Sequence, residues 1–213
     1  MSGTFNDIDV PPTLCSFAVD VAKIQDVVSP ELKKAGNVLV KFDIEKDEYS
    51  LPVYEQLMKL YTDILNMIHD KTIVSAYAVG FGGICEAVSK MAFGNGFGVE
   101  IDASVSADEL FSKDYGSIIA EVSPENLDKI TAAYKKIAKV TDKAEFVYGD
   151  AVISMKEALD KWTGKLESVF PTRSGVEQKE LEDKLYDAKT VYTAKTKIAR
   201  PKVFIPVFPG TNC

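Results

Sequence analysis

The clearest hydrophobic pattern in the chain lies between residues 51 and 69. Apolar side chains recur there at steps of three and four: Val53, Leu57, Leu60, Ile64 and Met67. This spacing places them on one face of a helix. Ser50 stands at the N-cap position, and Pro52 falls in the first turn, where its missing N–H costs little. The pattern predicts an amphipathic helix over 51–69.

Shorter apolar runs alternate with further helical patterns along the rest of the chain. β-Rich runs predict strands at 13–21, 38–44, 72–79, 99–102, 116–122 and 144–152. Helices are expected at 84–93, 106–109, 123–137 and 153–162. Some links between these elements have hairpin length, which favours a mixed sheet over a purely parallel one. The expected fold class is therefore α/β (α+β), a mixed β-sheet flanked by helices.

Composition divides the chain into four parts. Residues 1–12 are polar and end in two prolines, which predicts an extended lead-in. Residues 13–172 carry the alternating elements of the α/β domain. Residues 173–200 are rich in lysine and acidic residues and predict a solvated helical linker, with its helix over 175–197. Residues 201–213 contain a very apolar run, which predicts the first strand of a further domain that is cut short.

Composition also narrows the classes of function. The 213 residues are 46% hydrophobic, enough for one sizeable core. The 25 Lys and Arg against 32 Asp and Glu leave a net charge of −7, which argues against nucleic acid or an anionic membrane as a partner. No apolar run approaches the ~20 residues of a membrane span. The N-terminal residues also lack the pattern of a signal peptide.

The cysteines and the single histidine exclude several kinds of site. Three widely spaced cysteines predict reduced thiols and a cytoplasmic location. His69 is the only histidine, which rules out a two-histidine zinc motif. It ends a predicted helix, so we expect it to cap the helix dipole, with ligation or catalysis as the alternative. We expect Cys85 to be a small buried residue, with a nucleophile of lowered pKa as the alternative.

A glycine-rich turn at 80–83 is the best local signal for chemistry. It follows a predicted strand and precedes a predicted helix, whose free N–H groups and dipole favour phosphate. Gly80 and Gly82 resemble the opening of a dinucleotide fingerprint, and Glu100 or Asp102 follows about 20 residues later as a ribose-binding acid. Cys85 replaces the third glycine, however. A tight packing turn, a phosphate contact and a dinucleotide-binding module therefore all remain open.

The other candidates have simpler explanations. The glycines at 94, 96 and 98 follow a helix and precede a strand, which predicts a helix C-cap and a tight turn. We expect the Trp162 side chain to pack over the end of a helix. Six acidic residues without a spacing that forces them together are expected to be surface carboxylates: Glu86, Glu100, Asp102, Glu121, Asp150 and Glu157.

Three regions of the chain resemble one family, and the first of them along the chain consists of two short segments. Residues 75–95 resemble the C-terminal half of the second synthetase-like unit of large phosphoribosylformylglycinamidine synthases, a half that is similar to the C-terminal domain of aminoimidazole ribonucleotide synthetase. Residues 12–18 and 29–33 look like the start of this domain. Residues 200–213 look like the start of the family's class I glutaminase domain. The three regions occur in the family's order and span nearly the whole chain.

The resemblance implies a piece of a larger enzyme. The family uses ATP, Mg²⁺ and glutamine to convert formylglycinamide ribonucleotide to the amidine in purine biosynthesis. The partners it implies are the synthetase N-terminal half, the glutaminase domain and a small nucleotide substrate. Catalytic residues and metal ligands would lie outside this chain. The isolated chain is expected to be inactive and to bind no cofactor tightly.

The glycine turn departs from the family's pattern. Where many relatives carry H-D-x-S-D-G-G, this chain has the residues 77–83, Y-A-V-G-F-G-G. Both aspartates and the serine are gone, and alanine or phenylalanine cannot ligate magnesium. Backbone N–H contacts to phosphate do not depend on side chains. Gly80, Gly82 and Gly83 are therefore the phosphate- or nucleotide-binding residues that the resemblance implies.

Overall fold

The structure is a computed structural model that describes residues 3–10, 14–19, 21–171, 190, 193–200 and 202–209. The chain divides into two units, Met1–Thr172 and Arg173–Cys213. Within the described residues, no helix is both long and apolar enough to cross a membrane.

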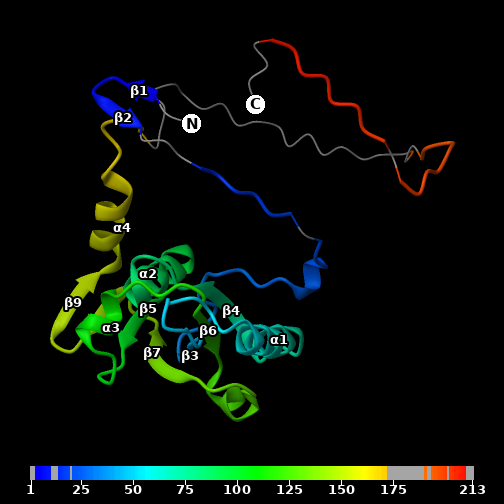
Figure 1. Ribbon diagram of the computed structural model, residues 1–213. Helices are drawn as coiled ribbons and strands as arrows, with labels where there is room; N and C mark the ends of the chain where they lie inside the picture. The colour runs from blue at the N-terminus through cyan, green and yellow to red at the C-terminus, as the bar shows by residue number, and fades with distance from the viewer. Residues whose placement is uncertain are drawn as a thin grey trace. The chain divides into compact units, whose positions relative to one another are not determined.

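A seven-stranded sheet forms the centre of the first unit (Figure 1). Its strands are β3 (Val38–Phe42), β4 (Ile73–Ala78), β5 (Gly98–Ile101), β6 (Ile118–Val122), β7 (Lys135–Thr141), β8 (Glu145–Tyr148) and β9 (Ala151–Ser154). Their order is β4-β6-β3-β7-β5-β8-β9. Neighbours are antiparallel except β5 and β8, which are parallel. The predicted mixed sheet is confirmed.

Helices cover both faces of this sheet. The helices are α1 (Tyr54–His69), α2 (Gly83–Asn95), α3 (Ala107–Phe111) and α4 (Met155–Gly164), with short 3-10 helices η1 (Ile24–Asp26) and η2 (Pro124–Lys129). Successive strand residues point to opposite faces, and β3 shows the result. Val40 and Phe42 pack with the α1 residues Ile64 and Met67, whereas Leu39 belongs to the core around α2. The sheet therefore lies between two helical layers.

The strongest predicted helix forms, but it begins later than expected. α1 starts at Tyr54, and no side chain caps its first turn. Ser50 instead lies in a tight turn with φ of +62°, and its N–H donates to the Asp47 carbonyl at 3.0 Å. Pro52 forms an isolated bridge with Lys46, so the chain is still extended there. The predicted Ser50 cap is therefore wrong, whereas the end at His69 is confirmed.

The helix predicted over 123–137 is wrong beyond its first turns. The 3-10 helix η2 is followed by β7, which pairs with β3 on one side and β5 on the other. Ile137 and Val140 are fully buried within this strand. Pairing with two neighbours satisfies the backbone of β7, and this tertiary gain overrides the local helical spacing.

The predicted strand at 144–152 is a hairpin instead. β8 and β9 pair antiparallel from Glu145 opposite Ser154 to Tyr148 opposite Ala151. The turn at Gly149 and Asp150 uses a φ of +57° at the glycine, a conformation that glycine adopts without strain. A two-residue turn of this kind was not anticipated within an otherwise continuous β-rich run.

The N-terminal residues also differ from expectation. The polar lead-in forms a small hairpin of β1 (Gly3–Phe5) and β2 (Ile8–Val10), with a φ of +52° at Asn6 in its turn. The strand predicted over 13–21 does not form in the described residues 14–19 and 21. Leu14 and Phe17 are 97% and 91% exposed there. A β-rich sequence becomes a strand only when another strand supplies backbone partners.

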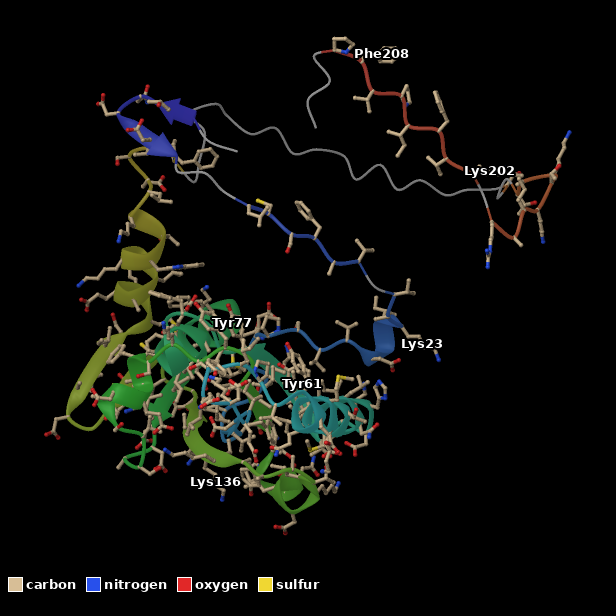
Figure 2. The ribbon with its side chains drawn as sticks, viewed as in Figure 1. Lys23, Tyr61, Tyr77, Lys136, Lys202 and Phe208 are labelled. Carbon is tan, nitrogen blue, oxygen red and sulfur yellow. The ribbon has the colours of Figure 1, made fainter. Side chains whose placement is uncertain are left out.

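The second unit shows neither of its predicted elements in its described part. Residues 193–200 form bends rather than helix, and the rest of the helix predicted over 175–197, apart from residue 190, lies outside the described residues. Residues 203–207 form no strand, although their side chains alternate along an extended backbone between the labelled Lys202 and Phe208 (Figure 2). The assignments of 173–200 to a linker and of 201–213 to a glutaminase domain stay predictions.

Candidate functional site

The glycine-rich turn connects β4 to α2 as predicted. Backbone hydrogen bonds hold its first residue on two sides, because the Gly80 carbonyl accepts from the N–H of Gly83 at 3.3 Å and of Asp114 at 3.1 Å. Phe81 projects outward and is 76% exposed. The turn is therefore fixed to the segment before β6 and displays an aromatic side chain.

Gly83 is required by packing. Its φ is +66°, and a Cβ at this position would lie 2.5 Å from the Ser112 carbonyl oxygen and 2.9 Å from that of Leu110. Both carbonyls belong to the end of α3 or the residue after it. The close approach of α3 to the start of α2 explains this glycine without any ligand. At Gly80, by contrast, the nearest atom to a Cβ would be a Glu86 oxygen at 3.9 Å.

The N-terminus of α2 already holds a carboxylate. Glu86 Oε2 accepts from the Gly82 N–H at 2.7 Å, and Glu86 Oε1 accepts from Lys90 Nζ at 2.6 Å. The lysine first and the Gly82 N–H second lower the pKa of Glu86 below its ordinary value. The charge that the helix N-terminus favours is thus supplied by the chain itself. Glu86 is partly exposed, as expected of a surface carboxylate, but its contacts with Gly82 and Lys90 were not predicted. The four-residue steps from Gly82 to Glu86 to Lys90 were the missed signal.

This turn does not fit a magnesium-bound nucleotide as it stands. The residues from Tyr77 to Phe81 offer no carboxylate, and Glu86 is engaged with Gly82 and Lys90. Magnesium requires hard oxygen ligands in a near-octahedral arrangement. Within the described residues, no group of three or more His, Cys, Asp or Glu side chains could hold a metal. The phosphate role of Gly80, Gly82 and Gly83 stays a prediction.

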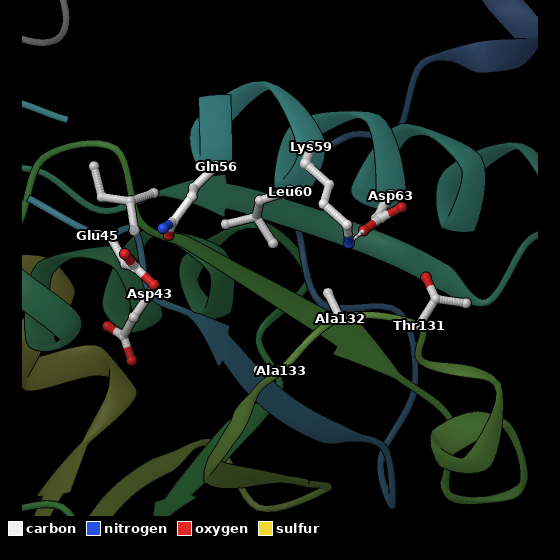
Figure 3. Close-up of a pocket in the computed structure, with 10 residues that line it drawn as sticks. Asp43, Glu45, Gln56, Lys59, Leu60, Asp63, Thr131, Ala132 and Ala133 are labelled. Carbon is white, nitrogen blue, oxygen red and sulfur yellow. Dashed lines mark hydrogen bonds and ion pairs between the residues drawn. The ribbon is translucent and has the colours of Figure 1, made fainter. Parts of the chain in front are cut away.

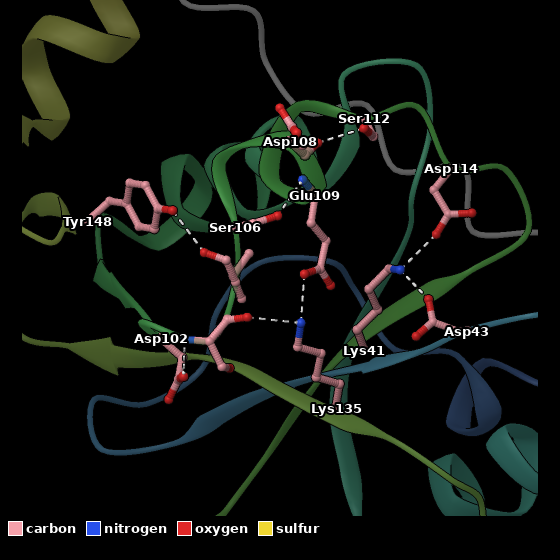
Figure 4. A network of polar contacts seen from close by, with 12 residues as sticks. Lys41, Asp43, Asp102, Ser106, Asp108, Glu109, Ser112, Asp114, Lys135 and Tyr148 are labelled. Atoms are coloured by element: carbon pink, nitrogen blue, oxygen red, sulfur yellow. Dashed lines mark hydrogen bonds and ion pairs between the residues drawn. The ribbon is translucent and has the colours of Figure 1, made fainter.

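A buried lysine, Lys41, lies on β3 near the segment before β6 that is hydrogen-bonded to the glycine turn. Lys41 Nζ pairs with Asp114 Oδ2 at 2.8 Å and with Asp43 (Figure 4). Lys46 Nζ reaches the other oxygen of the same carboxylate, Asp114 Oδ1, at 2.6 Å. Burial alone would lower the pKa of Lys41 and raise the pKa of Asp114, but the hydrogen bonds of the two groups together have the larger effect. They raise the pKa of Lys41 and bring the pKa of Asp114 to about 2. A lysine within an apolar strand was the available signal, and the sequence reasoning missed it.

A second ion pair lies at the same end of the neighbouring strands β3 and β7. Lys135 Nζ at the start of β7 binds Glu109 Oε2 of α3 at 2.6 Å and the Ser104 carbonyl at 3.2 Å (Figure 4). Ser106 caps α3 by accepting from the Glu109 N–H, as the sequence predicts. These ion pairs tie α3 and the segment before β6 to the ends of β7 and β3. They position α3 and thereby the carbonyls that crowd Gly83.

The acid of the dinucleotide fingerprint is not where that motif needs it. Glu100 lies in β5 and Asp102 just after it, whereas the glycine turn follows β4. Three strands, β6, β3 and β7, separate β4 from β5. At about 4.8 Å per strand the two strands are about 19 Å apart. Asp102 instead accepts from the Ser104 N–H at 2.8 Å in a local turn. The structure does not bring these acids to the glycines.

Cys85 and His69 occupy ordinary structural positions. Burial raises the pKa of the Cys85 thiol, the opposite of what a nucleophile needs. His69 ends α1 as predicted, and its Nε2 lies 3.7 Å from Asp26 Oδ1. Trp162 stacks on Phe93 with ring centroids 5.5 Å apart, as a packing residue would. None of these side chains forms part of a catalytic arrangement.

Glu121 is a further correction. It was expected at the surface, but it is fully buried on β6. Its carboxylate accepts from the N–H groups of Lys33 and Lys34 at 2.7 and 3.0 Å and from Asn37 Nδ2 at 2.7 Å. Three hydrogen bonds offset the cost of burying the charge. Glu121 therefore fixes the segment that leads into β3.

A polar pocket of about 330 Å³ lies between α1 and the residues that follow η2 (Figure 3). Its lining includes three carboxylates, those of Asp43, Glu45 and Asp63. Its one lysine, Lys59, is 3.0 Å from Asp63 and so is already paired. An acidic lining of this kind repels phosphate groups. The pocket is therefore a poor alternative to the glycine turn for a nucleotide.

Comparisons with known proteins match this fold. Residues 27–147 match the family described as AIR synthase related protein, C-terminal domain. The phosphoribosylformylglycinamidine synthase subunit PurL of Pelagibacter ubique is 28% identical over 169 residues, 69% of this chain and 23% of that protein. The same subunit of Thermoplasma volcanium is 35% identical over 88 residues, 38% of this chain and 11% of that protein.

A solved structure agrees at the level of the fold. T. maritima PurL complexed with AMPPCP superposes with a TM-score of 0.54 at 16% identity, over 63% of this chain and 27% of that chain. The chain thus spans less than a quarter of the length of the two curated relatives. These matches confirm the resemblance to phosphoribosylformylglycinamidine synthases. Because residues 27–147 are more than half of the 213, the chain belongs to the family of AIR synthase related proteins through their C-terminal domain.

Proposed function

We propose that this chain is the synthetase C-terminal part of a phosphoribosylformylglycinamidine synthase. The full enzyme would be an amidoligase that uses ATP, Mg²⁺ and glutamine to convert formylglycinamide ribonucleotide to formylglycinamidine ribonucleotide. The observation that carries the proposal is the family match over 27–147, which spans the sheet from β3 into β8. The two PurL relatives support it, and both are several times longer than the matched segment.

The partners in this proposal are the remaining parts of the enzyme. A synthetase N-terminal half would supply most nucleotide and metal ligands, and a glutaminase domain would supply ammonia. The T. maritima PurL of the structural comparison was solved with AMPPCP bound. In the present chain the carboxylate that accepts from the glycine turn is that of Glu86, and it is paired with Lys90. ATP and Mg²⁺ would therefore be held by the full enzyme and not tightly by this part.

Activity of the purified 213-residue chain tests the proposal directly. Incubation with formylglycinamide ribonucleotide, ATP–Mg²⁺ and either glutamine or ammonia should give no amidine product and no ATP hydrolysis. An antibody against the chain should detect a native product severalfold larger in the source organism. Turnover by this chain alone, or a native product of its own size, would contradict the proposal.

Calorimetry separates this proposal from a stand-alone dinucleotide module. We expect at most weak binding of ATP–Mg²⁺ and none of NAD, and micromolar affinity for NAD would favour the module. Phosphate at Gly80, Gly82 and Gly83 must displace the Glu86 carboxylate from the Gly82 N–H. Glu86→Gln should therefore strengthen ATP binding severalfold. The control Glu100→Gln makes the same charge change in β5, far from the turn, and should leave ATP binding unchanged.

The proposed domain layout has its own test. We propose that 13–172 is the synthetase part, preceded by a lead-in over 1–12, with 173–200 as linker and 201–213 as the start of the glutaminase domain. Limited proteolysis should then trim residues 172–213 well before it cuts the body. A tail that resists the protease as long as the body does would contradict this layout.

A further inference from the structure

The loop between β3 and α1 contributes to two pockets of opposite charge. The acidic pocket of Figure 3 takes Asp43 and Glu45 from this loop. A second pocket, of about 440 Å³, takes Lys46 and Ser50 from it, and the charged side chains that line this pocket are two lysines, Lys46 and Lys113. A volume of this size suits a small organic molecule. The charge of the lining favours an anion.

Direct contacts hold the walls of this second pocket together. The Tyr61 hydroxyl of α1 donates to the Gly116 carbonyl at 2.8 Å, which ties α1 to the segment before β6. Lys46 Nζ lies 2.6 Å from Asp114 Oδ1, which ties the loop to the same segment. The pocket is therefore formed before any ligand enters, and this lowers the entropic cost of binding.

The charge of Lys46 is balanced within the chain, whereas that of Lys113 is not. Lys46 belongs to the network around Asp114, which pairs two lysines with two aspartates. Lys113 is exposed and makes no ion pair with any described residue. The lining therefore has a surplus of one positive charge. A singly charged anion matches this surplus better than a doubly charged phosphate ester does.

The acidic residues of the loop do not line the second pocket. Asp43 and Glu45 line the acidic pocket instead. Asp47 is engaged inside the loop, where its Oδ1 accepts from the N–H groups of residues 49 and 51, each at 2.9 Å. Glu48 is exposed in the turn and is not part of the lining. An anion in the pocket would therefore meet lysines and not carboxylates.

The pocket also offers a neutral donor and apolar surface. Ser50 is exposed, and its hydroxyl makes no hydrogen bond to any described residue. Burial raises the pKa of Tyr61, so its phenol stays neutral and does not repel an anion. Apolar surface comes from Pro52, Leu57 and the ring of Tyr115, which is 58% exposed. Aromatic rings in the wall favour a planar aromatic ligand.

We propose that this pocket binds a small aromatic carboxylate. The carboxylate would accept hydrogen bonds from Lys113, Lys46 and the Ser50 hydroxyl, of which the two from lysine are charge-assisted. The aromatic body would lie against the apolar wall around Tyr115. Because the pocket is open to water and the ligand is small, the affinity is in the low millimolar range. This inference does not depend on the proposed enzyme function.

An NMR titration of the isotope-labelled full chain with cinnamate tests the proposal and locates the site. Cinnamate should shift the amide signals of residues 46–52 and 113–116 in a saturable way. Cinnamamide has the same aromatic body without the charge, so it should bind there about fivefold more weakly. Absence of saturable shifts at these residues, or equal binding of the acid and the amide, overturns the proposal.

Variants at exposed positions separate the charge from the apolar wall. Lys113→Gln should weaken cinnamate binding about fivefold and leave cinnamamide binding unchanged. The matched control is Lys165→Gln, the same charge change at the exposed C-cap of α4 outside the pocket lining, and it should bind both ligands like wild type. Tyr115→Ala should weaken both ligands severalfold, because it removes apolar surface. Wild-type binding of cinnamate by Lys113→Gln, or of both ligands by Tyr115→Ala, overturns the proposal.

Discussion

Two glycine-rich turns bound α2, and they differ in what holds them. Gly83 at the start and Gly96 just after the end have nearly the same backbone conformation, with φ of +66° and +73°. A Cβ on Gly83 would meet the Ser112 carbonyl at 2.5 Å, whereas nothing lies within 4 Å of a Cβ on Gly96. The N–H of Gly96 bonds to the Ala92 carbonyl in an ordinary left-handed C-cap.

The first turn is also held by charged groups. Gly82 donates to the Glu86 carboxylate, and Gly80 accepts from the N–H of Asp114, which is paired with two lysines. The second turn is held by backbone geometry and by close packing at Gly98. The comparison teaches that glycine composition alone does not indicate a ligand. Gly83 needs to be glycine because of crowding, whereas Gly96 needs it mainly for backbone freedom.

The largest effect is expected at the end of the second turn. Gly98→Ala would place its Cβ 1.7 Å from the Lys143 carbonyl oxygen, where backbone on both sides must shift. We expect a loss of more than about 3 kcal/mol in the free energy of unfolding. Urea denaturation followed by circular dichroism measures it. Gly164→Ala, where nothing lies within 4 Å of the Cβ, is the control and should be neutral. A near-neutral Gly98→Ala would contradict the packing of β5.

Gly83→Ala should be the next most damaging change. It combines a positive φ with a clash against the end of α3, and together these should cost about 3 kcal/mol. The same denaturation series compares it with Gly96→Ala. Equal losses at the two positions would mean that α3 moves freely, and the contrast between the turns would then disappear.

Acid should weaken the ion pairs of Asp114, the residue whose N–H bonds to Gly80 in the first turn. The pKa of Asp114 is about 2 in the fold, below its ordinary 3.8. Its stabilisation is therefore complete above about pH 4 and is lost as pH falls toward 2, by about 2 kcal/mol. Asp114→Asn should remove this part of the acid sensitivity between pH 6 and 2. The exposed Asp150→Asn is the control, and identical acid profiles for both variants would contradict the prediction.

Gly96→Ala should have the smallest effect. The left-handed conformation strains alanine, but no neighbouring atom is in the way, so the loss should be about 1 kcal/mol. Gly96→Asn should lose less, because asparagine tolerates this conformation. Thermal melting of the two variants measures the difference. A loss at Gly96 as large as that at Gly83 would show that Gly96 is crowded as well.

Local patterns predicted a large part of the fold. The period of α1, the break at 80–83, the Ser106 cap and the Gly96 C-cap all follow from spacing within a few residues. Helices and their caps are decided over such short distances. The family resemblance of residues 75–95 rests on the same local segment. The predictions of α2 and of the mixed sheet were correct for these reasons.

What the sequence determined by itself is thus the mixed α/β class, the helices α1 and α2 and the family. Only the tertiary structure decided that residues 135–141 become the strand β7 between β3 and β5, and that Lys41 and Glu121 are buried with partners. It also decided that Glu86 occupies the helix N-terminus. The reason is that strand pairing and buried charges depend on residues far apart in the chain, whereas helical spacing and caps do not.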